Sequence, residues 1–325
     1  MIKLKDIAGS CGVSVSTVSR ALNGNSLIRP EVAEKIRAAA REMGYQPNEV
    51  ARSLKTNRSR MIGILYESDM DHPFFSGLLE TLRSSAEKRG YDLALLSRIS
   101  REDGPDTADL ALGRRMDGVV VVYAGITEDG LDRLMQNQIP VVSVDDCSRP
   151  CPMIVSDYEN GTRILAEEAI RRGRRRIAFL HGEYGYATGL RIKGYREVMA
   201  AKGLLEELIP ARFNQGGLCA ELIRTRLRQP DPPDCFLLPD DNSALTAVQQ
   251  LKRAGFRIPE DVGIAGFDGQ KWVLNYCPEL STFRQNLEGI GEAALEKLLS
   301  LRDQKINRSR SEMIITGRLY PGETL

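Results

Sequence analysis

Apolar residues in the first sixty positions recur at the spacing of short helices. In LKDIAGSCG, Leu4 and Ile7 lie on one helical face, and Gly12 follows where that helix would end. Ser14 is a good N-cap for VSTVSRAL, whose surface carries small hydroxyl side chains and one arginine. A third helix is predicted to begin at Pro30. The pattern is typical of a helix-turn-helix, although a generic three-helix bundle would show the same periodicity.

From Met61 onward, apolar runs of strand length alternate with amphipathic helices. The first half of this region contains MIGILYES, DGVVVVYA and PVVSVDD, and the second half contains RRIAFLHGE, DCFLLPDD and DVGIAGFD. Near-continuous apolar strands separated by helices predict parallel sheets covered by helices on both faces. Two runs of similar size predict an α/β body of two lobes with a cleft between them, attached to an all-α headpiece.

Polar side chains follow several of these predicted strands. Ligands of open parallel sheets bind beyond the carboxyl ends of the strands, so residues at those ends are candidates for ligand contact. The candidates are Glu67, Ser68, Asp69, Tyr123, Asp145, Asp146, His181, Glu183, Asp240, Asp241 and Asp268.

Charge is unevenly distributed along the chain. The formal net charge is only +1, yet residues 1–60 carry an excess of lysine and arginine and the remainder carries an excess of acids. A small basic module joined to a mildly acidic body is the asymmetry expected of a nucleic-acid-binding protein.

Several classes of protein are disfavoured by what the sequence lacks. No apolar run approaches the roughly 20 residues that span a bilayer, and the start of the chain has no signal-peptide pattern, so we expect a cytoplasmic protein. The cysteines are scattered, which predicts free thiols and no metal site. With no nucleophile elbow, phosphate loop or dinucleotide fingerprint, and with His72 and His181 as the only histidines, we expect neither an enzyme nor a cofactor.

The order of residues in the headpiece carries a more specific signal. KDIA, GVS, STVSRALNG, GYQPN and ARSL resemble the headpiece of the lactose-repressor (LacI/GalR) family of bacterial regulators, in family order and spacing. The resemblance implies that the second helix enters the major groove of DNA, where Val15, Ser16 and Arg20 face base edges. Arg20 can donate two hydrogen bonds to a guanine. Thr17 and Asn23 are expected to hold phosphates or to cap helices.

The segment after Pro47, NEVARSLKTNR, is too short to form a stable helix in water unless it is packed. The resemblance implies a hinge helix that pairs with a second copy in the minor groove of DNA. Leu54 would then wedge between base pairs, and Arg52, Ser53 and Lys55 would contact the DNA around it. The alternative is that Leu54 is only the apolar face of a linker helix.

The body resembles the effector domain of the same family, whose fold is shared with periplasmic sugar-binding proteins. HPFFSGLLE, GYDLALL, RRIAFL, AGFRIPEDVGIAGFD and ELSTFRQN carry this resemblance. It implies an effector cleft lined by Phe74, Asp145, Arg191, Asp241 and Asp268. Trp272 could stack on a sugar or be a structural aromatic. Two positions depart from the family pattern: Asp240 stands where asparagine is usual, and Gly269 where a second aspartate is usual.

These observations predict a DNA-binding transcriptional regulator, expected to be a repressor, that reads a pseudo-palindromic operator as a homodimer. A small molecule, expected to be a carbohydrate or sugar phosphate although nucleobases also occur in the family, would control it from the cleft. The alternative is a solute-binding protein of the same fold without a regulatory role.

The expected parts are a headpiece over 1–46, a hinge over 47–60 and an effector domain over 61–325. Within the last, the N-lobe takes about 61–156 and 286–317, and the C-lobe about 157–285 and 318–325.

Overall fold

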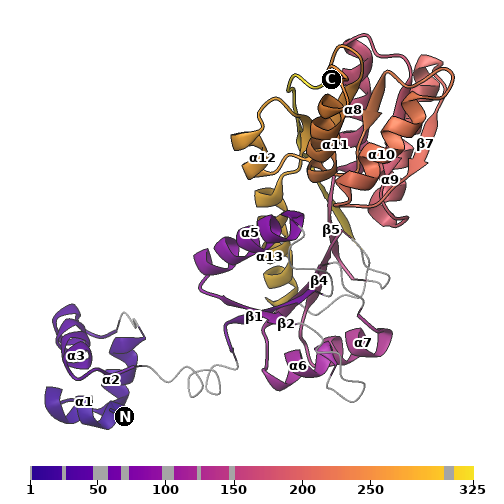
Figure 1. Cartoon of the computed structure of the whole chain (residues 1–325). Helices are drawn as coiled ribbons and strands as arrows, with labels where there is room; N and C mark the ends of the chain where they lie inside the picture. The colour runs from indigo at the N-terminus through magenta and orange to yellow at the C-terminus, as the bar shows by residue number, and fades with distance from the viewer. Residues whose placement is uncertain are drawn as a thin grey trace. The chain divides into compact units, whose positions relative to one another are not determined.

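A computed structural model of the chain describes residues 2–23, 27–46, 58–66, 73–96, 106–122, 126–145, 151–303 and 311–325. The chain divides into two compact units, Met1–Ser59 and Arg60–Leu325. Figure 1 shows the elements of both units. The first unit is called the headpiece below and the second the effector unit.

The headpiece contains three helices, α1 (Leu4–Cys11), α2 (Val15–Leu22) and α3 (Pro30–Glu42). One side chain from each, Ile7, Val18 and Ile36, is fully buried in a shared core. Gly12 ends α1 in the left-handed conformation with φ 70°, and the Ser14 side chain caps α2 by accepting a hydrogen bond from the backbone N–H of Thr17. The predicted helix-turn-helix is confirmed.

The effector unit is built around two six-stranded sheets. The first, in the order β11-β5-β4-β3-β1-β2, is parallel throughout, and the second, in the order β12-β10-β9-β8-β6-β7, is parallel except for the pair of β10 with β12. We call the two sheets with their helices the first and second lobes. The strands of the first are β1 (Met61–Tyr66), β2 (Asp92–Leu96), β3 (Gly118–Val122), β4 (Val141–Val144), β5 (Met153–Ser156) and β11 (Glu312–Ile315). The strands of the second are β6 (Ile177–His181), β7 (Glu207–Pro210), β8 (Cys235–Leu237), β9 (Gly263–Asp268), β10 (Ser281–Arg284) and β12 (Arg318–Tyr320).

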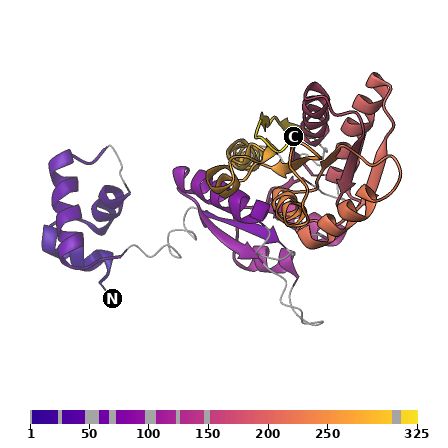
Figure 2. The same ribbon diagram turned by 45° about the horizontal axis from the view of Figure 1, so that its top comes forward.

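Helices cover both faces of each sheet, as the near-continuous apolar strands predict (Figure 2). Neighbouring residues of a strand enter different cores: Ile64 and Leu65 of β1 do so in the first lobe, and Ile264 and Ala265 of β9 in the second. The first lobe has α5 (Pro73–Lys88), α6 (Thr107–Gly113), α7 (Glu128–Gln136) and α13 (Leu287–Asp303). The second has α8 (Tyr158–Arg171), α9 (Tyr186–Lys202), α10 (Gly216–Leu227), α11 (Asp241–Arg253) and α12 (Lys271–Tyr276).

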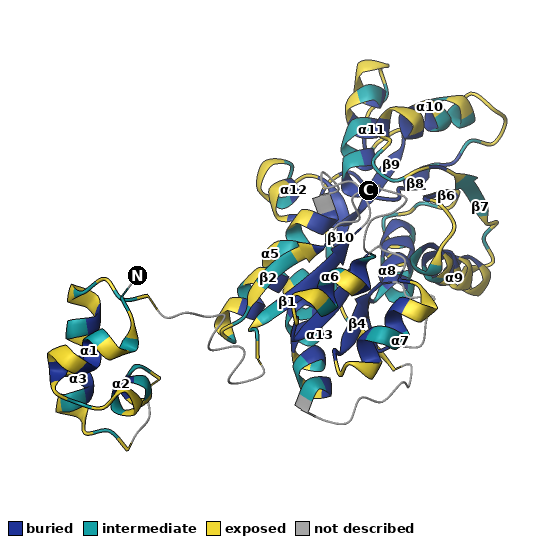
Figure 3. Ribbon diagram, turned by 90° about the horizontal axis from the view of Figure 1, so that it is seen from below, coloured by how far each residue is buried: buried dark blue, intermediate teal, exposed yellow. Residues whose placement is uncertain are grey.

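The central strands of both lobes are buried while the outward faces of the helices are exposed (Figure 3). The chain crosses between the lobes after β5, after β10 and after β11. The predicted fold class, a helix-turn-helix headpiece with a two-lobed α/β body, is therefore confirmed.

The described part of the chain has no disulfide and no group of acidic, histidine or cysteine side chains that could hold a metal ion. Within the same residues, no helix is both long enough and apolar enough to cross a membrane.

Candidate nucleic-acid interface and effector site

One side of α2 is used for the headpiece core and the other is left open. Val18 and Ala21 are buried, whereas Val15, Ser16 and Arg20 are exposed. Val15 is 46% exposed. The open side thus presents an apolar group, a hydroxyl and a guanidinium within one and a half helical turns, and these are the groups that can contact a thymine methyl or the hydrogen-bonding edge of a base.

Hydroxyl groups at the start of α2 hold one another in place. The Ser14 Oγ atom lies 2.8 Å from both the Ser16 Oγ and the Thr17 Oγ1 atoms, and it accepts from the Thr17 backbone N–H at 3.1 Å. At the other end, the Asn23 side-chain amide donates to the Ser19 carbonyl at 2.7 Å. Thr17 and Asn23 therefore stabilise the helix ends, and their contact with DNA stays a prediction.

Arg20 differs from these neighbours. Its side chain is exposed, and none of the ion pairs within the described residues involves it. By contrast, Arg37 and Arg41 on α3 both pair with Glu34, at 2.9 Å each. Arg20 is thus available to an external acceptor. The hinge residues Arg52, Ser53, Leu54 and Lys55 lie outside the described residues, as do Ser68 and Tyr123 of the predicted effector site.

A cluster of buried polar side chains lies at the carboxyl ends of β8, β9 and β10 in the second lobe. Asp241, the first residue of α11, is fully buried, and one carboxylate oxygen accepts from the Thr282 hydroxyl at 2.6 Å. Its other oxygen accepts from the Gln270 backbone N–H at 3.1 Å. Burial raises the pKa of Asp241 to about 7, against the effect of these two hydrogen bonds. Asp241 can therefore carry a proton near neutral pH.

Asp268 ends β9 and has a left-handed backbone with φ 111°. Its side chain accepts a hydrogen bond of 2.7 Å from the Gln285 amide. Burial, and then the charges of Asp241 and Asp240, raise the pKa of Asp268 well above its usual range, while Arg191 and Gln285 act in the opposite direction. Two acids so close together cannot both ionise easily, and a protonated carboxyl can donate a hydrogen bond as well as accept one.

Arg191, on α9, is the buried cation of the cluster. Its guanidinium donates to the Pro239 carbonyl at 2.8 Å and to the Leu238 carbonyl at 3.3 Å. It also lies over the ring of Phe267, 3.9 Å from the ring centroid. These contacts fix the orientation of the guanidinium beside the carboxyl end of β8.

Asp240 and Asp241 are adjacent but have different roles. Asp240 is the N-cap of α11: it accepts from the Ser243 backbone N–H at 2.7 Å, from the Ser243 hydroxyl at 2.9 Å and from the Asn214 N–H at 2.8 Å. Its carboxylate is occupied by these donors. Both oxygens of Asp240 accept hydrogen bonds, which the single amide oxygen of an asparagine could not do. Only Asp241 belongs to the centre of the cluster.

The remaining predicted effector residues lie around this cluster or in the other lobe. Trp272, on α12, is 40% exposed, and its indole N–H donates to the Gln270 side chain at 2.7 Å. Phe74 and Asp145 belong to the first lobe, where Phe74 is buried in the core and Asp145, at the end of β4, accepts from the Ser156 N–H at 3.2 Å.

Three further residues complete the cluster and are not among the predicted site residues: Gln270, Thr282 and Gln285. Thr282 and Gln285 lie on β10 or directly after it. The rule that identifies Asp268, a polar residue at a strand end, applies equally to Gln285, and STFRQN has too few apolar residues to stand out as a buried strand.

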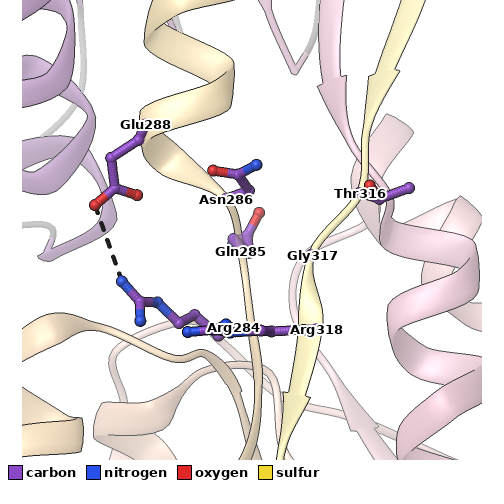
Figure 4. Close-up of a pocket in the computed structure, with 7 residues that line it drawn as sticks. All are labelled: Arg284, Gln285, Asn286, Glu288, Thr316, Gly317 and Arg318. Atoms are coloured by element: carbon purple, nitrogen blue, oxygen red, sulfur yellow. Dashed lines mark ion pairs between the residues drawn. The ribbon is translucent and has the colours of Figure 1, made fainter.

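A pocket of about 370 Å³ lies beside this region, where β10, β12 and the start of α13 meet (Figure 4). Arg284 reaches across it toward Glu288, and the shortest distance between the guanidinium and the carboxylate is 3.9 Å. The lining residues are Arg284, Gln285, Asn286, Glu288, Thr316, Gly317 and Arg318.

Comparison with known proteins agrees with both units. The model of the lacI family of bacterial regulatory proteins matches residues 3–48, and that of a periplasmic binding protein-like domain matches residues 166–325. The HTH-type transcriptional repressor PurR of Vibrio atlanticus is 31% identical over 320 residues, which cover 95% of each chain.

Two solved structures share the fold. A lac repressor dimer bound to operator and the anti-inducer ONPF has a TM-score of 0.81 at 24% identity, over 99% of this chain and 98% of that chain. A complex of the transcriptional regulator CelR with cellobiose has a TM-score of 0.71 at 22% identity, over the whole of both chains.

Proposed function

This chain belongs to the lacI family of bacterial regulatory proteins, as a DNA-binding transcriptional repressor under the control of a small molecule, and we propose that it reads a pseudo-palindromic operator as a homodimer. A headpiece of three short helices contacts few base pairs, so two copies on a two-fold site supply the specificity that one copy lacks. The similar lac repressor structure is a dimer on its operator, which supports this arrangement. The PurR relatives are named as transcriptional repressors, in agreement with the lack of catalytic motifs in the sequence.

The observation that carries the DNA-binding proposal is the open side of α2. Val15, Ser16 and Arg20 are exposed on one side of a helix whose other side is buried in the core. We assign base contacts to these three residues, with Arg20 donating two hydrogen bonds to the O6 and N7 atoms of a guanine. In the hinge, Leu54 is proposed to open a base step in the minor groove, with Arg52, Ser53 and Lys55 beside it.

Selection of binding sites from random duplex DNA tests this proposal. The full chain should enrich a two-fold symmetric sequence, and Arg20→Ala should lose the preference for one base pair in each half-site, at a cost of about 1–3 kcal/mol. Arg37→Ala is the matched control, because Arg37 is also exposed but lies on α3 and pairs with Glu34. An enriched site without symmetry, or one that Arg20→Ala leaves unchanged, would contradict the proposal.

For the effector, we propose a carbohydrate or sugar phosphate held between the lobes, with Arg191, Asp241 and Asp268 as its main contacts in the second lobe. Sugar hydroxyls both donate and accept hydrogen bonds, and a protonated acid beside a fixed guanidinium offers both complementary groups. Phe74, Asp145 and Trp272, with Ser68 and Tyr123, are proposed to complete the cleft. The CelR structure of the same fold holds cellobiose, which supports a sugar.

A thermal-shift screen of the full chain tests the effector class. Sugars, sugar phosphates and nucleobases form the three arms, and we expect a ligand from the first two to raise the unfolding temperature. Asp268→Asn should abolish that shift, whereas the exposed variant Arg196→Gln should retain it. A response confined to nucleobases, or one that Asp268→Asn retains in full, would rule out this assignment.

A further inference from the structure

Two arginines stand directly opposite each other on neighbouring strands of the second lobe. β10 and β12 are antiparallel, and their register pairs Arg284 with Arg318. Like charges at directly opposed positions of an antiparallel pair destabilise the sheet. The carboxylate that lines the same pocket, Glu288, is 71% exposed and lies 3.9 Å from Arg284, so it offsets little of this repulsion. The pocket therefore holds excess positive charge.

The backbone around Arg284 is shaped to keep its position fixed. Gly269 has φ 58°, and a Cβ atom there would overlap the Cα and Cβ atoms of Arg284. A Cβ atom at Gly317 would overlap the Arg284 carbonyl oxygen from the adjacent strand. Arg284 thus lies against two glycines, and any side chain at either position would displace its backbone.

Gln285 lines the same pocket but keeps its unsatisfied acceptor buried. Its side chain is 3% exposed and its amide group donates to Asp268, but its Oε1 atom finds no donor among the residues that the structure describes. A buried acceptor without a donor costs about 1–3 kcal/mol. This oxygen is closed off from solvent, so the contacts to a ligand in the pocket are left to the two arginines.

We propose that this pocket binds a phosphate group, either as orthophosphate or as a phosphate monoester. Guanidinium groups bind phosphate oxygens through two parallel hydrogen bonds, and two arginines facing one space can hold one phosphate between them. The volume of about 370 Å³ admits a small ligand. This site lies beside the proposed effector cluster and is distinct from it, with Gln285 touching both.

Isothermal titration of the full chain with sodium orthophosphate tests the site, with sodium chloride at matched ionic strength as the blank. Saturable binding is expected for the parent chain. Arg318→Gln should weaken it at least tenfold, and Arg318→Lys, which keeps the charge but loses the planar fork, should weaken it less. Arg196→Gln, which removes an exposed arginine of the same lobe from its ion pair with Glu206, should bind as the parent does. Binding equal in Arg318→Gln and the parent, or heat no larger than that of chloride, would overturn the proposal.

Two further measurements make the test specific. Without phosphate, Arg318→Gln should unfold at the same temperature as the parent or higher, because it removes the like-charge pair. A lower temperature would show that Arg318 stabilises the sheet by itself and would count against the site.

Titration with methyl phosphate, a monoester without a sugar, distinguishes the two forms of the ligand. If it binds at least as tightly as orthophosphate, the ligand is a monoester, and if it binds more weakly, the ligand is free phosphate.

Discussion

The open side of α2 and the acid cluster of the second lobe both present polar groups to a partner, but they do so in opposite ways. On α2 the groups are exposed, and Arg20 makes no ion pair within the described residues. In the second lobe the polar groups are buried, and Asp241, Asp268 and Arg191 each accept or donate internal hydrogen bonds.

The difference follows from solvent. An exposed polar side chain costs little free energy before DNA is bound, since water molecules form its hydrogen bonds. A buried polar group must be satisfied by the protein itself, because desolvation without a partner is costly. The DNA-reading residues should therefore be almost neutral for stability, whereas the effector residues should carry part of the stability of their lobe. Four predictions test this contrast.

The largest effect is expected for Arg191→Ala. The substitution removes two hydrogen bonds to the carbonyls of Pro239 and Leu238 and the packing on Phe267, so it should lower the free energy of unfolding by about 3 kcal/mol. Urea unfolding of the full chain followed by tryptophan fluorescence measures it, since Trp272 lies in the same lobe. Arg196→Ala on the same helix is the control and should change stability by less than about 0.5 kcal/mol. If Arg191→Ala and Arg196→Ala lowered the free energy of unfolding equally, the buried effector residues would not carry more stability than exposed ones.

Stability of the second lobe should depend on pH through Asp241. Its pKa is about 7 in the folded chain and near 3.8 in the unfolded chain, so the folded chain binds the proton more tightly. The stabilisation is complete below pH 3.8 and is lost as the pH rises through 7. Between pH 5 and 7 this loss is about 2 kcal/mol. Asp241→Asn, which imitates the protonated acid, should flatten the pH profile of urea unfolding relative to the parent; identical slopes would show that Asp241 does not titrate in this range.

Ser14 and Ser16 allow the stability of α2 to be tested separately from its proposed contact with bases. Ser14→Ala removes the N-cap and should destabilise the headpiece by about 1 kcal/mol. Ser16→Ala leaves the cap in place, and should alter operator affinity while changing stability little. Thermal unfolding of the headpiece by circular dichroism, set beside operator titration, compares the two. The contrast fails if Ser16→Ala destabilises the headpiece as much as Ser14→Ala does.

The smallest effect on stability is expected for Val15→Ala. Val15 is 46% exposed, so its truncation should change the free energy of unfolding by less than about 0.5 kcal/mol. The preference for one thymine in each half-site should nevertheless weaken, as selection from random duplexes would reveal. A fully retained base preference would remove Val15 from the proposed interface.

The recognition side of α2 is predictable from the sequence because it depends only on residues close together in the chain. A helical period and a cap at Ser14 decide which side chains face the core, and the remainder face outward. The alternation of strands and helices in the effector unit is predictable for the same reason, as is the placement of Asp268 at the end of a strand.

Other features required the tertiary structure. Thr282 meets Asp241 and Gln285 meets Asp268 only because the second sheet places β10 beside β9 and β9 beside β8. Asp240 and Asp241 look alike in sequence, but the start of α11 turns one toward its own cap and the other into the cluster. Arg284 and Arg318 are far apart in the chain, and the register of β10 with β12 opposes them. Periodicity determines which elements form and which side of each is buried; the order and register of strands, set by packing between distant segments, decide which polar groups meet.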